Sequence, residues 1–295
     1  IYAEADGIIR WGGVIVSSGF NGPAWTIEAA GFSTYPHGVP YLGDYSKTSV
    51  DPADAFREIW RHVQSNPDGN LGMIIDPLTT PARTGTAGQP YALSWWEAPD
   101  CGSELDNLAK LGPFDYAEEH AWIGEAVAHR IRLGYPRLGR RRTDLAFVQG
   151  DNITSTVAAE RSGDDFANEV IGVGAGQGRA MLQRRIPQRD GRLRRPFVYT
   201  DKALRDNARM DTTIRRELSA RRAVLEVGSV EVVDHPNAPI GSWQLGDDVL
   251  VQASIPWLGE VSIWERIVGW SLVSETRASL NLQRSDSFTY GGIPA

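Results

Sequence analysis

The chain has 295 residues, of which 41% are hydrophobic and 23% are charged, and its formal net charge is −7. This length has room for two domains, or for one large domain with an insertion. The negative charge argues against a general nucleic-acid-binding protein. The single cysteine, Cys101, excludes an internal disulfide framework and a cysteine-rich zinc site. No apolar run is long enough for a transmembrane helix.

The first fifty residues predict strands and a loop. Residues 8–16 form an apolar run that Gly12 and Gly13 interrupt, so we expect a bent strand there, and a second strand over 25–30. Residues 31–50 are rich in Gly, Pro, Ser and Tyr and predict a loop. No secretory signal is visible at the start. Because the sequence begins with Ile1 rather than Met, we expect the numbering to begin inside a longer protein.

Residues 51–143 mix helical and strand patterns. Asp51 as N-cap and Pro52 at the first helical position predict a helix, and Phe56, Ile59, Trp60 and Val63 give it an apolar face. A strand over 71–75 and a loop over 77–90 follow. Ser103 and Asp106 resemble a capping box for a helix that carries Leu105, Leu108 and Leu111. Residues 122–133 fit either alternation or a helix, and we favour a strand.

The pattern from residue 144 onward predicts a sheet. Short strands are expected at 145–148, 167–173, 180–186 and 197–199, before a charged helix over 201–222 with Asp201 as its cap. Four strands follow, over 222–233, 249–255, 261–267 and 278–282. The alternation of the first changes phase at Gly228, which indicates a β-bulge, and Gly246-Asp247-Asp248 predicts a turn before the second. The fold class is therefore α+β, with a helix-bearing segment between two β-rich regions.

Three motifs offer weak evidence for catalysis or cofactor binding. Gly172 to Gly178 follows a strand, but no helix pattern opens after it, so a glycine-rich hairpin turn is favoured over a dinucleotide site. His120 and His129 lie nine residues apart, which matches no zinc spacing. Asp115, Glu118 and Glu119 could supply a glycosidase carboxylate pair, although one acidic cluster decides little. Cys101 has no nearby histidine. We therefore predict no catalytic, cofactor-binding or metal-binding residues.

Two arginine runs and one tryptophan pair are candidate binding surfaces. Arginine is suited to binding phosphate or acidic surfaces, but solvated loops and intersubunit salt bridges are the favoured interpretation. The Trp95-Trp96 pair could stack on a sugar, although buried packing is commoner. The candidate contacts to other subunits, or to a central lumen, are Arg140, Arg141, Arg142, Arg192, Arg194 and Arg195.

Several phrases, taken in order along nearly the whole chain, carry a resemblance to a known family. They include Trp11-Gly-Gly-Val, the helix Asp51 to Trp60, Asn66-Pro-Asp-Gly-Asn-Leu-Gly72, Gly112-Pro-Phe-Asp-Tyr116, Gly134-Tyr-Pro-Arg-Leu-Gly139, Asn168-Glu-Val with Gly174-Ala-Gly176, Arg192-Leu-Arg-Arg195, Gly246-Asp-Asp-Val and Asp286-Ser-Phe-Thr-Tyr290. Together they resemble the minor tail proteins of actinobacterial siphophages, of the Gp37-like, tail-associated baseplate hub type. A more distant similarity is to the T-even phage baseplate hub.

This resemblance implies two β-barrel-like hub domains with an inserted α/β segment. Residues 1–50 would be the remainder of an N-terminal barrel whose start is missing, 51–143 the insertion, and 144–295 the C-terminal barrel. Three chains would form a homotrimeric ring that adapts the sixfold tail tube to threefold tip proteins and lets phage DNA pass. The implied partners are other copies, distal tail and tail tube proteins and other tip proteins, with no cofactor.

Two functions thus remain open from the sequence. The favoured one is a structural component of the virion, located at the tail tip and made in the cytoplasm of the bacterial host. The alternative is a tail-associated cell-wall hydrolase, either a glycosidase or a peptidase. A hydrolase requires converging acids or a metal-binding set, and the sequence offers no convincing example of either.

Overall fold

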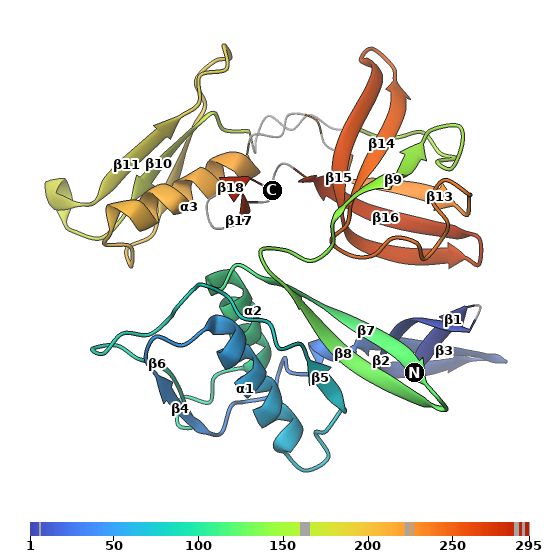
Figure 1. The fold of residues 1–295 in the computed structure, drawn as a ribbon, viewed down its shortest axis with the longest axis horizontal. Coiled ribbons are helices and arrows are strands. Elements are labelled where there is room, and N and C mark those ends of the chain that lie inside the picture. The colour runs from blue at the N-terminus through green and yellow to red at the C-terminus, as the bar shows by residue number, and fades with distance from the viewer. Residues whose placement is uncertain are drawn as a thin grey trace. The chain divides into compact units, whose positions relative to one another are not determined.

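The computed structural model describes residues 1–5, 7–159, 166–221, 225, 227–285, 289–290 and 293–294, the last two pairs for their backbone alone. The chain divides into two compact units, residues 1–138 and 139–295 (Figure 1). The predicted α+β class is confirmed, since both units combine sheets with helices. None of the described helices is both long and apolar enough to cross a membrane.

Unit 1 begins with a three-stranded antiparallel sheet in the order β1-β2-β3. Its strands are β1 (Tyr2–Ala5), β2 (Ile8–Asn21) and β3 (Ala24–Gly31). β2 pairs with β1 as far as Gly12 and with β3 from Gly13 onward, so the predicted glycine bend is the point where β2 changes partner. A Cβ on Gly13 would lie 2.3 Å from the carbonyl oxygen of Ala30, which explains the requirement for glycine. β2 also continues past the predicted end at residue 16.

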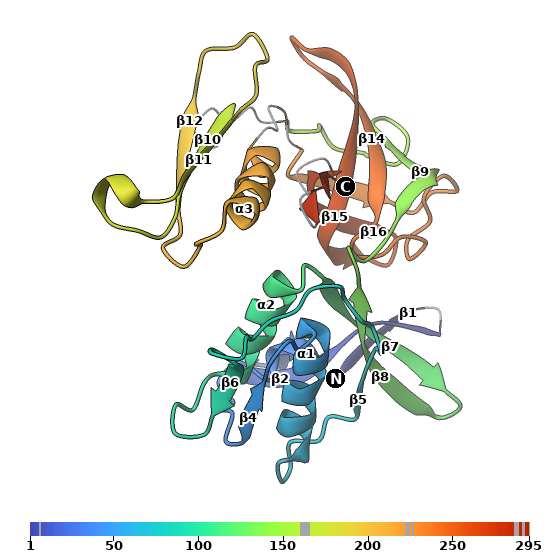
Figure 2. The ribbon, with the colours of Figure 1, turned by 60° about the vertical axis from the view of Figure 1, so that its left-hand side comes forward.

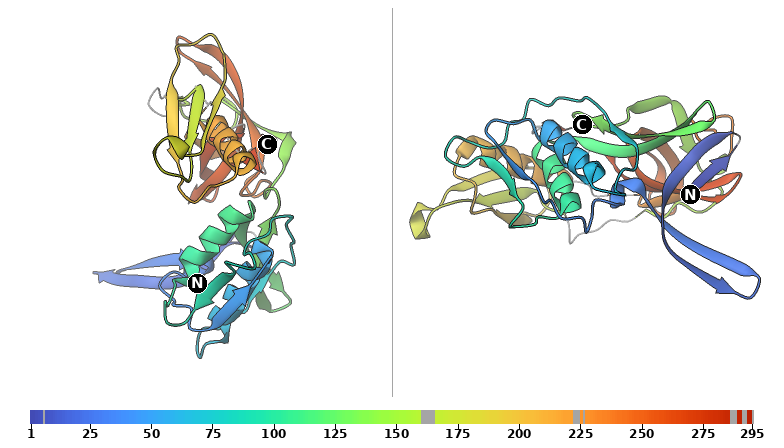
Figure 3. Two further views of the ribbon diagram at one scale, coloured as in Figure 1. Left: turned by 90° about the vertical axis from the view of Figure 1, so that its left-hand side faces the viewer. Right: turned by 90° about the horizontal axis from the view of Figure 1, so that it is seen from below.

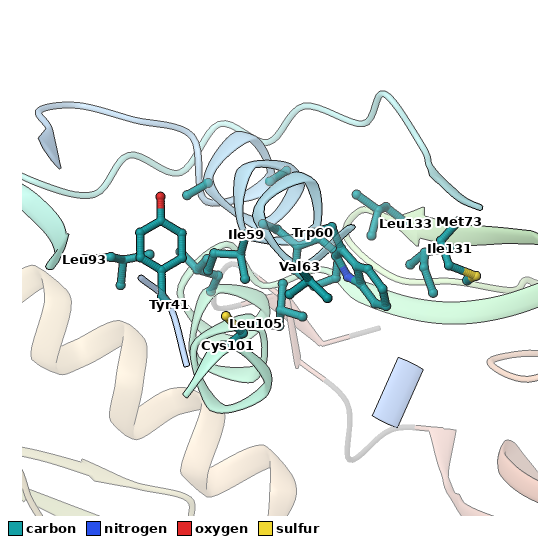
Figure 4. Close-up of a cluster of buried hydrophobic side chains, with 14 of the residues drawn as sticks. Tyr41, Ile59, Trp60, Val63, Met73, Leu93, Cys101, Leu105, Ile131 and Leu133 are labelled. Atoms are coloured by element: carbon teal, nitrogen blue, oxygen red, sulfur yellow. The ribbon is translucent and has the colours of Figure 1, made fainter. Parts of the chain in front are cut away.

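Two helices supply half of the buried residues in the core of unit 1. α1 (Pro52–Ser65) starts where predicted, with Asp51 accepting a hydrogen bond from the backbone N–H of Ala53. Its predicted apolar face is buried: in Figure 4 Ile59 and Val63 lie toward α2 (Cys101–Leu111), and Trp60 extends toward Met73, Ile131 and Leu133. Complete burial of such side chains contributes about 1.5–3 kcal/mol each. This core therefore holds the smaller elements of the unit in place.

The remaining strands of unit 1 form two small sheets. β4 (Asp44–Lys47) pairs with β6 (Tyr91–Ser94), and β5 (Met73–Ile75) runs parallel to β8 (Ala126–Gly134) in the order β5-β8-β7. β7 (Asp115–Ile123) and β8 form a hairpin that turns at Gly124, which settles residues 122–133 as strands with a turn between them. Residues 31–50 are not all loop: besides β4 they contain a 3-10 turn, η1 (Phe32–Thr34).

The main sheet of unit 2 has the order β13-β16-β15-β14-β9. Its strands are β9 (Arg141–Val148), β13 (Ser229–Val233), β14 (Asp248–Ile255), β15 (Gly259–Ser274) and β16 (Arg277–Arg284). Isolated bridges join Ile153 to Gln149 beside β9 and to Val232 on β13. Both ends of the sheet therefore reach Ile153. These single bridges curl the sheet, but the described residues form no closed barrel.

A second, smaller sheet of unit 2 carries a helix. β10 (Glu169–Val173) lies between antiparallel β11 (Gln183–Pro187) and parallel β12 (Pro196–Thr200), and the 3-10 turn η2 (Gly178–Ala180) precedes β11. α3 (Asn207–Ala220) packs against this sheet (Figure 2). The backbone pair β17 (Thr289–Tyr290) and β18 (Ile293–Pro294) completes the described chain.

Three predicted boundaries were wrong for local reasons. α3 begins at Asn207 because Asp206, not Asp201, accepts the hydrogen bond from Arg209 N–H; Asp201 instead accepts from Ala203 in a turn. Likewise Asp100, three residues before Ser103, caps α2. The strand predicted over 222–233 starts at Ser229; residues 222–224 and 226, and 286–288 of the closing phrase, lie outside the described residues.

Candidate assembly surface

The first three candidate contacts, Arg140, Arg141 and Arg142, divide between the surface and the interior of unit 2. Arg140 and Arg141 are exposed, and the guanidinium of Arg141 lies 4.7 Å from the ring centre of Trp264. Arg142 is only 8% exposed. Its Nε and Nη2 donate to the two carboxylate oxygens of Asp144, at 2.9 and 2.7 Å. Its guanidinium is therefore held inside its own unit.

Asp247, in the predicted Gly246-Asp247-Asp248 turn, is the second partner of Arg142. Its Oδ2 accepts from Arg142 Nη1 at 3.1 Å, and its Oδ1 accepts from the backbone N–H of Arg140 at 3.0 Å. Asp247 is completely buried. This carboxylate therefore links the start of β9 to the start of β14, which is a structural role.

Two arginines of the second run, Arg185 and Arg194, pair with the buried carboxylate of Glu169 in the smaller sheet of unit 2. Arg194 donates from Nε to Oε2 of Glu169 at 2.5 Å, and Arg185 forms a further ion pair with the same glutamate. The hydrogen bonds from Arg194, together with Arg185, lower the pKa of Glu169. Arg192 pairs with Asp190, and the backbone N–H of Arg195 donates to Asn168. The side chains of Arg192, Arg194 and Arg195 remain exposed, so contacts to a lumen or to another subunit stay predictions.

The three acidic residues considered for glycosidase chemistry do not converge. Asp115 accepts from the backbone N–H of Leu138, whereas Glu119 faces Arg132 at 3.8 Å. Glu118, one residue earlier on β7, projects from the opposite face of the strand. There it accepts from the backbone N–H groups of Phe32 and Ser33 at 2.8 and 2.9 Å, which ties η1 to β7.

His120 and His129 are neighbours in the structure, although their nine-residue spacing in the sequence matched no metal site. They are cross-strand partners on β7 and β8, with their Nδ1 atoms 3.2 Å apart. Nε2 of His120 lies 3.3 Å from Glu118, and Nε2 of His129 lies 3.1 Å from the hydroxyl of Tyr2. Burial and the neighbouring His120 lower the pKa of His129. Within the described residues, no three His, Cys, Asp or Glu side chains gather as metal ligands.

The structure also shows the surroundings of three other sequence features: the glycines from 172 to 178, Cys101 and the Trp95-Trp96 pair. Gly172 lies in β10, and Gly174, Gly176 and Gly178 belong to the connection between antiparallel β10 and β11, as predicted for a hairpin turn, and not to a strand-to-helix phosphate loop. Cys101 is buried at the start of α2, and burial raises the pKa of its thiol to about 12, which leaves it protonated at neutral pH. The expectation of buried packing for Trp95 and Trp96 was wrong, because both rings are exposed.

The most exposed apolar surface of unit 1 was not predicted from the sequence. It is the outer part of the β2–β3 hairpin, residues 15–28, which we call the arm. In Figure 3 this blue hairpin projects away from the rest of its unit. One signal could have revealed it: no charged residue occurs from Trp11 to Ile27, in a chain with 23% charged residues. In a strand with one solvent-exposed face, polar or charged residues normally alternate with apolar ones. From Trp11 to Ile27 no charged residue takes part in such an alternation.

Comparison with known proteins places this architecture. No family model matches the chain, and no curated protein sequence matches it either. A solved structure that does match is the 43 kDa tail protein of prophage MuSo2 from Shewanella oneidensis, with a TM-score of 0.66 and 13% identity over 97% of this chain and 83% of that one. The chain has the fold of prophage tail proteins.

Two further structures agree with this tail-protein fold. The tail protein from Neisseria meningitidis MC58 has a TM-score of 0.61 and 14% identity over 97% of this chain and 83% of its own. The prophage tail protein gp18 from Listeria monocytogenes EGD-e has a TM-score of 0.56 and 10% identity over 95% of this chain and 78% of its own. Each match covers at least 95% of the chain and therefore includes residues of both units.

Proposed function

We propose that this chain is a structural protein of a long-tailed phage, located at the tail tip, where three copies form a baseplate hub. The observation that carries the proposal is the tail-protein fold over 97% of the chain. The order of the sequence phrases supports the more specific assignment to the hub of an actinobacterial siphophage. As a hub, the ring would join the sixfold tail tube to threefold tip proteins and would let DNA pass.

The arrangement of the sheets supports assembly into a ring. The main sheet of unit 2 is curled, and both of its ends reach single bridges at Ile153. The family resemblance implies two barrel-like elements in each chain, so three chains would give six. Contacts between unlike surfaces close into a ring when the rotation between neighbouring copies fits. Six elements in such a ring would match the sixfold symmetry of the tail tube. The exposed Arg140, Arg141, Arg192, Arg194 and Arg195 are proposed contacts in this ring or its lumen.

Size-exclusion chromatography with light scattering tests the assembly. We expect a particle with three times the 32.4 kDa mass of the chain, and a larger complex when tail tube protein is added. A particle that stays at the mass of one chain, with or without tube protein, would contradict the hub. Zymography on host cell wall tests the alternative, because a cleared band at the position of this chain would favour a hydrolase.

A further inference from the structure

The arm has the surface of a buried element although it is exposed. Ile15, Val16, Phe20 and Trp25 are 46%, 65%, 79% and 56% exposed. Phe20 and Trp25 are cross-strand partners whose rings stack, with centroids 5.9 Å apart and planes 8° apart. The two aromatic rings therefore form one rigid apolar surface near the tip. Exposed apolar area of this kind costs about 25 cal/mol per Å² relative to burial.

The backbone of the arm also has unused pairing edges. β1 pairs with β2 only as far as Gly12, so along the arm the described strands form a two-stranded ribbon. Such a ribbon is only marginally stable in water without a third strand or a packed face. The one charged side chain of the arm, Glu28 at its base, accepts a hydrogen bond from Ser17 at 2.6 Å. A surface that covers the arm thus needs apolar side chains and backbone groups, and no counter-charge.

These properties favour a protein surface over a lipid bilayer. The open edges of the ribbon present N–H and C=O groups that hydrocarbon cannot satisfy. A neighbouring strand or loop satisfies them, as in strand addition at a sheet edge. The polar Ser17, Ser18 and Asn21 beside the aromatic pair are likewise suited to a protein partner.

The charge distribution favours a second copy of the chain as that partner. Each copy carries a net charge of −7, so like-charge repulsion opposes contact over most of the surface. The arm has no charged residue from Ile15 to Ile27, so this part of it avoids the repulsion. The chain also offers a matching surface: β15 has no charged residue from Ile267 to Ser274, and Val268, Leu272 and Val273 there are exposed. Every copy therefore has both an arm that is uncharged from Ile15 to Ile27 and an uncharged apolar segment of β15 on which such an arm could pack.

We propose that the arm docks on a second copy of this chain and is the main contact that holds the ring together. The inference rests on the proposed hub, and it identifies which segment makes the ring. In a head-to-tail ring each copy would extend its arm to one neighbour and receive the arm of the other. The stacked Phe20 and Trp25 would then be the aromatic anchor of the interface.

Light scattering on arm variants tests this contact. The double variant F20S/W25S should elute at the mass of one chain under conditions where the unmodified protein is a trimer. The loss of two aromatic anchors is expected to raise the dissociation constant at least about 100-fold. A second variant, V16D, places a charge at another exposed apolar position of the arm and should have the same effect. Neither substitution should lower the melting temperature of the single, dissociated chain, because the altered side chains are exposed within their own unit.

Trp257 provides a matched control outside the arm. It is fully exposed in the β14–β15 turn and has a φ of 69°, a conformation that asparagine tolerates. The variant W257N removes an exposed aromatic ring without touching the arm, and it should keep the trimeric mass. Amide hydrogen exchange supplies a second measurement: residues 15–28 should be protected in the trimer and unprotected in F20S/W25S.

The outcomes separate the two proposals. If the unmodified protein is a trimer and F20S/W25S and V16D are trimers as well, the arm contact is wrong while the hub remains. If the unmodified protein is a single chain with and without tube protein, the hub fails first. Vesicles of phosphatidylcholine and phosphatidylglycerol test the lipid alternative. If the unmodified trimer binds these vesicles, and F20S/W25S stays trimeric but does not bind them, the arm docks on lipid and the docking on a second copy is overturned.

Discussion

The core of unit 1 and the main sheet of unit 2 are held together by different kinds of side chain. The buried cluster around α1 and α2 consists of apolar and tyrosine side chains, and within the described residues Asp51 is the one charged residue buried in unit 1. In unit 2 the described sheets bury six charged residues: Arg142, Glu169, Asp247, Asp248, Glu265 and Arg266. Unit 1 is therefore held together by hydrophobic burial, and unit 2 also depends on pairs of charges.

This difference has consequences for assembly and stability. Apolar contacts tolerate small displacements, whereas a buried ion pair fixes the register of the strands that carry it, because a lone buried charge is costly. Asp247 and Arg142 connect β9 and β14, two strands that are far apart in the sequence. If unit 2 is one element of a ring, its charges would keep the sheet in one register when neighbours bind.

The largest expected effect is in the apolar core. The substitution Trp60→Ala should lower the free energy of unfolding of unit 1 by about 4–5 kcal/mol, because a completely buried indole leaves a cavity. Urea unfolding, combined with amide exchange to assign the loss to unit 1, measures it. The exposed Trp96 supplies the control, since Trp96→Ala should change the stability by less than about 0.5 kcal/mol. Equal losses in both variants would contradict the burial of Trp60.

The next effect is at the buried ion pair of unit 2. Asp247→Ala should cost about 3 kcal/mol, because it leaves the guanidinium of Arg142 buried with one partner fewer. The same unfolding experiment measures it, with amide exchange reporting on residues 139–295. The double variant R142M/D247N should lose less than the sum of its single variants by at least about 1 kcal/mol. Additive losses would mean that the two side chains act independently.

A smaller effect is expected at the cap of α1. Asp51→Ala should cost about 1–2 kcal/mol. The buried Asp51 accepts from Ala53 N–H at 2.9 Å and also from the backbone and the hydroxyl of Thr80, at 2.6 and 2.8 Å. Asp100→Ala, at the more exposed cap of α2, should cost about 1 kcal/mol or less. Thermal unfolding compares the two variants, and a larger loss for Asp100 would reverse our ranking.

The smallest effect is a dependence on pH from Asp144. Its hydrogen bond with Arg142 lowers the pKa of Asp144 from 3.8 to about 2. The unfolded chain therefore binds more protons between these values, so this contribution to stability is complete above pH 4 and is lost as the pH falls towards 2. Asp144→Asn should flatten that part of the pH profile of the urea midpoint. An unchanged slope in this window would show that other acids produce it.

The parts of the fold that local sequence predicts are those that local physics determines. Asp51, Pro52 and the four apolar residues of α1 lie within thirteen positions of one another and were sufficient to place the start and the buried face of the helix. The cap of α2 was misplaced because Asp100 and Ser103 are both good cap residues, and the hydrogen bond from Ser103 N–H to Asp100 identifies Asp100 as the cap. The start of α3 was misplaced in the same way.

The candidate surfaces were predicted less well, because they depend on contacts between distant residues. The arginines were recognised, but Arg142 proved to be buried by Asp247, a residue 105 positions away. His120 and His129 meet only because the turn at Gly124 sets the register of β7 and β8. For the arm, the sequence predicted only the ends of its two strands, over 8–16 and 25–30, since an apolar run does not reveal whether its own chain covers it.

The sequence by itself determined the α+β class, the α1 helix with its buried face, the glycine hairpin after β10 and the similarity to tail proteins, because each depends on neighbouring residues or on their order. The tertiary structure alone decided which charges are buried, which histidines meet and that the arm projects uncovered. Alternation and helical spacing specify which face of an element is apolar. What covers that face is set by strand register and by packing between segments far apart in the chain, and no local pattern contains that information.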